Sequence, residues 1–97
     1  MDEYAVEVTA KGADGSLEPF HIYVGAPEIK DGVHACLWWC TGFSGGFWQG
    51  GASPEQAYRE AFKNVARLIH HDGLTLLTTD GAPFHLPDPP DGCEEKG

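Results

Sequence analysis

The stretch Ser53–Gly73, SPEQAYREAFKNVARLIHHDG, decides the fold, because it holds a helix start, an apolar face and a helix stop in that order. Ser53 can cap free backbone N–H groups, and Pro54 suits the first helical position. Gln56, three residues after Ser53, completes the pattern of a capping box. At the other end, Gly73 suits a left-handed C-cap. The sequence therefore predicts one long helix between these residues.

This helix is predicted to have one apolar and one polar face. The apolar residues recur at three- and four-residue spacing and are Ala57, Tyr58, Ala61, Phe62, Val65, Leu68 and Ile69. On the polar side, Arg59, Lys63 and Arg67 repeat every four residues, and they form a narrow cationic stripe that we interpret as a contact for an anionic ligand or partner. The alternative is an ordinary solvated face, in which Glu55 pairs with Arg59.

Three strands are predicted before the helix. Apolar and polar residues alternate with a period of two over residues 3–11 and 17–24, and the turn residues between them predict a hairpin. Gly25-Ala26-Pro27 is expected to end the second strand, since proline cannot donate to a ladder. A third strand is predicted over residues 33–41, and both of its faces are apolar, which is typical of a central strand covered on each side.

The remaining elements complete the predicted fold class. The glycine-rich stretch Gly42–Gly51 leaves room for a short fourth strand, and residues 74–78 and 84–86 are expected to form a closing hairpin. We therefore predict a single α+β domain over residues 1–86, with an antiparallel sheet of about four or five strands and the helix packed on one face. The other face is expected to be covered by a loop, the tail or a second subunit. The acidic, proline-rich tail over residues 87–97 is predicted to be disordered.

Charge and composition exclude several functions. Fifteen acidic residues against six basic ones give a formal net charge of −9 over 97 residues, so the surface repels phosphate backbones and we expect no nucleic-acid partner. No apolar window approaches the ~18 residues that span a bilayer, so no membrane association is expected. The acidic N-terminus and the odd number of cysteines favour a cytoplasmic location.

The sequence holds no convincing catalytic or metal-binding motif. Residues 42–46 match G-x-S-x-G around Ser44, but the helix begins too late for a nucleophile elbow, so we interpret them as a flexible turn. Cys36 and Cys40 would lie about 13 Å apart along a strand, too far for one zinc ion. We therefore expect no catalytic residue, no metal and no cofactor.

Aromatic residues concentrate in a dozen positions and give the clearest indication of function. The predicted interface consists of Trp38, Trp39, Phe43, Phe47 and Trp48. If these side chains face solvent, they mark a protein contact, because aromatic residues supply much of the binding energy at interfaces. The alternative is that they pack in the core. We accordingly expect a non-enzymatic protein-interaction module, homodimeric or bound to another protein, with neutralisation of a basic partner by an antitoxin or immunity protein as a specific version.

A second function remains open on the residues alone. Aromatic side chains, histidines and flexible glycines coincide near the Gly42–Gly51 loop. A small-molecule-binding protein or minor enzyme would have its pocket between the sheet and this loop. Its polar groups would come from His21, His34, His85 or Ser44.

The order of several short motifs resembles a family of small bacterial proteins that carries only a domain-of-unknown-function label. The matching segments are Tyr4-Ala5-Val6-Glu7, Gly25-Ala26-Pro27, Cys36, Gly42-Phe43 and the run from Gly51 to Ala57. This resemblance implies three strands followed by a long helix, and it implies no activity. The run GASPEQAYREA, residues 51–61, is also similar to the helix opening of HicB-like antitoxin domains. The chain differs from those domains in its acidic charge, so we expect no repressor role.

Overall fold

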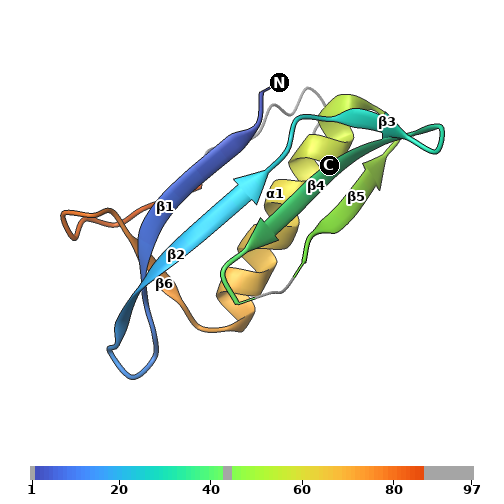
Figure 1. Ribbon diagram of the computed structural model, residues 1–97. Helices are drawn as coiled ribbons and strands as arrows, with labels where there is room; N and C mark the ends of the chain where they lie inside the picture. The colour runs from blue at the N-terminus through green and yellow to red at the C-terminus, as the bar shows by residue number, and fades with distance from the viewer. Residues whose placement is uncertain (1, 43–44, 87–97) are drawn as a thin grey trace, which may run out of the picture.

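The computed structural model describes residues 2–42 and 45–86, and all structural statements below concern these residues. The elements are β1 (Tyr4–Lys11), β2 (Leu17–Val24), β3 (Glu28–Lys30), β4 (Val33–Cys40), β5 (Phe47–Gly51), α1 (Pro54–His71) and β6 (Thr75–Leu77). The six strands form one antiparallel sheet, and α1 packs across one face (Figure 1), which confirms the predicted α+β class. Phe43, Ser44 and the predicted tail lie outside the described residues.

The strand registers show how the sheet is ordered. β1 pairs with β2 along its whole length and with β6 on its other side. In β4, Trp38 lies opposite both Val24 of β2 and Phe47 of β5. His34 likewise lies opposite Ile29 of β3 and Gly51 of β5. β2 and β3 therefore follow one another along one edge of β4, and β5 occupies the other edge.

The prediction that the second strand ends at Gly25-Ala26-Pro27 was incomplete. The Gly25 amide donates to the carbonyl oxygen of Leu37 at 2.7 Å, so the chain stays beside β4. It then pairs again as β3, which the sequence analysis missed. Between β3 and β4 the chain reverses at Asp31-Gly32, where both residues have positive φ, 54° and 81°. The sheet consequently has six strands, where four or five were predicted.

The N-terminus of α1 has the predicted cap with one variation. The Ser53 hydroxyl accepts a hydrogen bond from the Gln56 amide at 3.1 Å. In a standard capping box the Gln56 side chain would reach the backbone of Ser53. Here it accepts instead from the amide of Ala52 at 2.6 Å. The first turn of α1 is therefore joined to the end of β5.

The C-terminus of α1 also ends as predicted. Gly73 has a φ of 68°, a conformation that glycine adopts without the Cβ clash of other residues. Its amide donates to the carbonyl of His70 at 3.1 Å, and the Leu74 amide donates to the carbonyl of Ile69 at 3.1 Å. This pair of hydrogen bonds is the Schellman motif, and it turns the chain toward β6.

The predicted closing hairpin after the helix forms only in part. β6 pairs with the end of β1, as residues Thr9–Lys11 lie opposite Leu77–Thr75. Beyond it, Pro83 makes a single bridge to Leu77, and the Phe84 amide donates to the carbonyl of Leu76 at 3.0 Å. Because proline lacks an N–H group, a regular ladder does not develop here.

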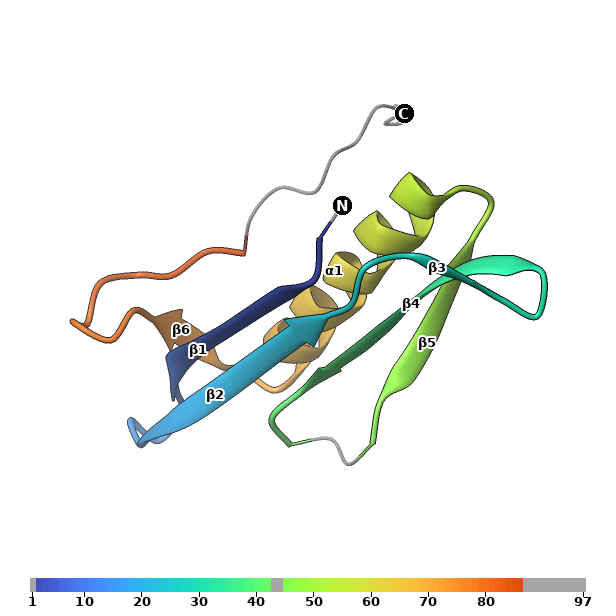
Figure 2. The same ribbon diagram turned by 45° about the horizontal axis from the view of Figure 1, so that its top comes forward.

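The core lies between α1 and one face of the sheet. Its buried residues are Val8, Ala10, Phe20, Ile22, Val24, Cys36, Trp38, Cys40, Ala57, Ala61, Phe62, Val65 and Leu76. In both views, α1 lies on one side of the sheet, and no described helix or strand covers the other side (Figures 1 and 2). Within the described ranges, no helix is long and apolar enough to cross a membrane. One face of the sheet is thus left without a covering helix or strand in the described part of the chain.

Candidate interaction surface

Alternation along β4 sends its two adjacent tryptophans to opposite faces of the sheet. Trp38 points toward α1 and is 6% exposed, so it belongs to the core. Trp39 points to the uncovered face and is 37% exposed. The expectation that Trp38 contributes to an exposed interface is therefore corrected, because the helix packs over its side of the strand.

Three aromatic side chains, one leucine and one lysine lie on the uncovered face. We call this set the aromatic face and define it as Tyr23, Leu37, Trp39, Trp48 and Lys30. The rings of Tyr23 and Trp39 stack with centroids 5.7 Å apart and an angle of 16° between the ring planes. On β5, Trp48 is 42% exposed and lies opposite Leu37 of β4. The Lys30 Nζ atom lies 4.7 Å from the centroid of the Trp48 ring, a cation–π contact.

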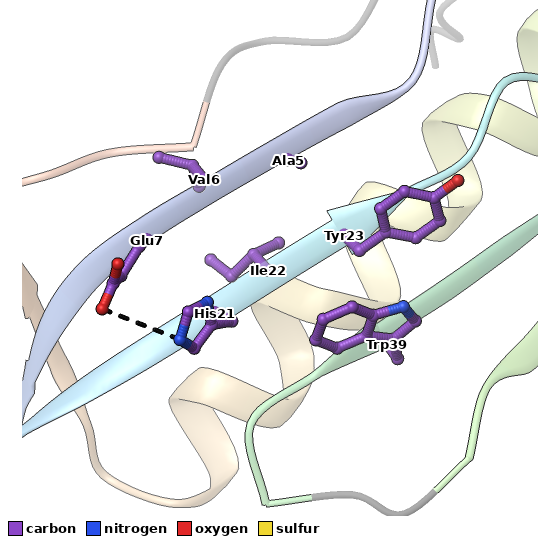
Figure 3. Close-up of a pocket in the computed structure, with 7 residues that line it drawn as sticks. All are labelled: Ala5, Val6, Glu7, His21, Ile22, Tyr23 and Trp39. Atoms are coloured by element: carbon purple, nitrogen blue, oxygen red, sulfur yellow. Dashed lines mark ion pairs between the residues drawn. The ribbon is translucent and has the colours of Figure 1, made fainter.

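Beside the stacked pair lies a shallow hollow of about 260 Å³. Glu7, His21, Tyr23 and Trp39 surround it in the close-up (Figure 3). Ala5, whose side chain is only a methyl group, lies opposite Tyr23 in the register and leaves this space open. The Glu7 Oε2 and His21 Nε2 atoms are 3.7 Å apart, and they form an ion pair when the imidazole is protonated.

Carboxylates border the aromatic face. The Tyr23 hydroxyl donates a hydrogen bond to Glu3 Oε1 at 3.1 Å. This hydrogen bond raises the pKa of Tyr23, with smaller contributions from desolvation and from the negative charges of Glu3 and Glu28. With Glu7 at the hollow, three acidic side chains thus lie near the Tyr23–Trp39 pair. The surface combines aromatic rings with negative charge, which is suited to binding a cation.

The structure brings only some of the predicted interface residues to this face. Trp39 and Trp48 lie on it, whereas Phe47 stacks on Trp38 with centroids 5.1 Å apart on the helix side. Phe43 lies outside the described residues. Tyr23 is not among the predicted interface residues, although the alternation of residues 17–24 separates it from the buried residues of the same strand.

The predicted cationic stripe lies on α1, away from the aromatic face. Lys63 pairs with Glu60 at 3.6 Å. Arg67 donates to the Asn64 side chain, which in turn donates to Gln49 of β5 at 2.6 Å. Arg59 is on the same helix and also has interactions. The structure therefore does not combine the cationic stripe and the aromatic residues in one site.

The described residues give little support to the alternative function, a small-molecule pocket near the Gly42–Gly51 loop. A pocket of about 220 Å³ adjoins Gly42, but none of His21, His34 and His85 lines it. In the part of the chain that the structure describes, no group of three histidine, cysteine or acidic residues is placed to hold a metal ion. Ser44 lies outside that part.

The two described cysteines are buried and unsuited to nucleophilic chemistry. Cys36 and Cys40 both lie in the core beneath α1. Burial, with a smaller contribution from the charge of Glu28, raises the pKa of Cys36 from 9.0 to about 11. Burial also raises the pKa of Cys40. Because the thiolate is the reactive form, both thiols are held unreactive in the folded protein.

The raised pKa of Cys36 predicts how the free energy of unfolding changes at alkaline pH. Below pH 9 the folded and unfolded chains both keep the Cys36 proton. Between pH 9 and about 11 the unfolded chain loses this proton while the folded chain keeps it, so the free energy of unfolding should fall as pH rises. Urea unfolding across this range measures the slope. Cys36→Ala should reduce the slope but not abolish it, because burial also raises the pKa of Cys40. An unchanged slope would contradict the assignment.

The fold and the surface define a small α+β protein with a helix on one face of an antiparallel sheet and aromatic residues on the other. Comparison with known proteins finds no matching family model, no matching curated protein and no matching solved structure.

Proposed function

We propose that the protein is a non-enzymatic, cytoplasmic protein-interaction module whose aromatic face binds a basic surface of another protein. The observation that carries the proposal is the uncovered sheet face with its exposed Trp39 and Trp48. Aromatic side chains that are partly exposed and contiguous are typical of protein contacts. Neutralisation of a basic partner, as by an antitoxin or immunity protein, is the specific form of this function that the net charge of −9 favours.

The chemistry of the face supports arginine as the central contact of the partner. The Lys30 ammonium on Trp48 illustrates that a ring of this face accepts a cation. At the hollow, Glu7 offers a carboxylate next to the stacked rings of Tyr23 and Trp39. A guanidinium group can stack on an aromatic ring and make two hydrogen bonds to a carboxylate at the same time. Lysine lacks this planar geometry.

The size of the hollow also favours a protein contact over a small-molecule site. Ligand pockets commonly enclose about 300–1,000 Å³ and cover most of their ligand. The hollow measures about 260 Å³ and lies open on the sheet surface. One side chain of a partner fits this space, with the rest of the partner lying on the surrounding face.

A titration with a defined peptide tests the proposal. The probes are a short arginine-rich peptide and the same peptide with citrulline in place of arginine, which keeps the shape and removes the charge. We expect the arginine peptide to shift the indole N–H resonance of Trp39, which lines the hollow, while buried Trp38 serves as the internal reference. Trp39→Ala should weaken binding about tenfold, as for a central interface aromatic.

The control variant is Ile29→Ala, which removes an exposed apolar side chain of β3 that is not part of the aromatic face. It should bind the peptide as the wild type does. Equal binding of the citrulline peptide, or shifts confined to residues of α1, would overturn the proposal.

A further inference from the structure

The end strands of the sheet differ in a way that points to a second interaction. Two of them are short: β6 has three residues and is followed by the bridge at Pro83, and β3 has three residues of which two are charged. The third is β5, at the border of the sheet (Figure 1), and no described strand pairs with its outer side. Edge strands are usually protected by charges, proline or short length. The five residues of β5, Phe47–Gly51, include no charged residue and no proline.

The sequence of β5 is complementary to itself in size. Aromatic residues occupy its first half, two glycines occupy its second half, and Gln49 lies between them. In an antiparallel pair centred on Gln49, Trp48 of one strand would lie opposite Gly50 of the other. Both residues point to the uncovered face, since residues two apart share a face of a strand. An aromatic side chain can cover the exposed backbone of a glycine across a strand pair.

From this complementarity we propose that β5 pairs with β5 of a second copy of the chain, in antiparallel register centred on Gln49. The Trp48 ring would then cover Gly50 of the partner and reach Val33, which is 48% exposed and packs next to Gly50. The contact between Trp48 and Gly50 forms twice in the dimer, with each copy supplying Trp48 to one contact and Gly50 to the other, as a two-fold axis requires. The pairing extends the sheet across two copies.

The helix side of the junction is compatible with this arrangement. The Asn64 side chain donates a hydrogen bond to the Gln49 side chain, so this side of α1 lies beside β5. The nearby helix surface carries charges of both signs, Glu60, Lys63 and Arg67. Two copies approaching there meet mixed charges, although each carries a net charge of −9. Because salt screens this net repulsion, the dimer should become stronger as ionic strength rises.

The inference goes beyond the proposed function and does not depend on it. The two-fold axis stands perpendicular to the sheet, so both aromatic faces point in the same direction. Trp39 and Tyr23 stay accessible on each copy, away from the junction. A dimer therefore offers two binding faces side by side, but either property can exist without the other.

Cysteine cross-linking tests both the dimer and its register. In a Cys93→Ser background, Gln49→Cys places two thiols directly opposite each other, where Cα atoms about 5 Å apart allow a disulfide. Trp48→Cys places its two thiols on the diagonal, about 7–8 Å apart, which is too far. Thr75→Cys in β6 is the matched control on the opposite edge. We expect a rapid disulfide-linked dimer from Gln49→Cys alone.

Sedimentation equilibrium of the unmodified chain, at low and high salt, provides the second measurement. We expect a dimer that dissociates on dilution, and Trp48→Glu should weaken it by at least about tenfold. Ile29→Ala should leave it unchanged. A strict monomer, or cross-linking equally rapid at Thr75→Cys, would overturn the pairing. A monomer that still binds the arginine peptide would overturn this inference alone, whereas a dimer that ignores the peptide would overturn only the proposed function.

Discussion

Replacement of Phe62 by alanine is expected to lower the free energy of unfolding by about 3–5 kcal/mol. Phe62 is 4% exposed and lies between the helix and the sheet. Its ring makes edge-on contacts with Tyr4 at 5.2 Å and with Tyr58 at 5.1 Å between centroids. The substitution removes these contacts together with buried apolar surface and leaves a cavity. Urea unfolding followed by tryptophan fluorescence measures the loss.

The matched control for this prediction is Leu17→Ala. Leu17 is 61% exposed at the start of β2, so its truncation should change the free energy of unfolding by no more than about 0.5 kcal/mol. A loss of under 1 kcal/mol for Phe62→Ala would mean that the helix does not dock on the sheet as described.

Replacement of Gly51 by alanine should also destabilise the protein strongly, by about 1–3 kcal/mol or more. A Cβ atom at this position would lie 2.6 Å from the amide nitrogen of Ala57 and 2.9 Å from its Cα atom. These are backbone atoms of the first helical turn, so they cannot move aside without shifting the helix. Thermal unfolding followed by circular dichroism detects the change.

Gly50→Ala provides the neighbouring control. A Cβ atom there would lie 3.4 Å from Cγ1 of the exposed Val33 side chain, an ordinary van der Waals contact. We expect little change in the melting temperature of this variant. Equal destabilisation by Gly50→Ala and Gly51→Ala would indicate that alanine is unfavourable anywhere in β5, and would contradict the close approach of the helix.

The helix could be predicted from the sequence because the features that define it are local. Ser53 and Gln56 lie within one turn of each other, and Gly73 alone reverses the chain at the other end. Strand β3 could not be predicted in the same way. Its pairing depends on the Gly25 contact with Leu37, which lies twelve residues further along the chain. Gly25-Ala26-Pro27 indicates a break whether or not a strand resumes after it.

The aromatic face was predictable only in part, for a related reason. Alternation shows that Trp38 and Trp39 point to opposite faces of a strand. It does not show which of these faces the helix covers, because helix docking is decided by the whole sheet. Tyr23 joins Trp39 through the pairing of β2 with β4, a contact between segments that no local pattern connects.

The uncovered face also affects the colloidal behaviour of the protein. Exposed aromatic residues tend to associate non-specifically, and like charge between molecules opposes this association. The net charge of −9 at pH 7 supplies that repulsion, while the face itself remains available to a partner of opposite charge. As acidification protonates the carboxylates, this protection is lost. The same face is then a surface for aggregation.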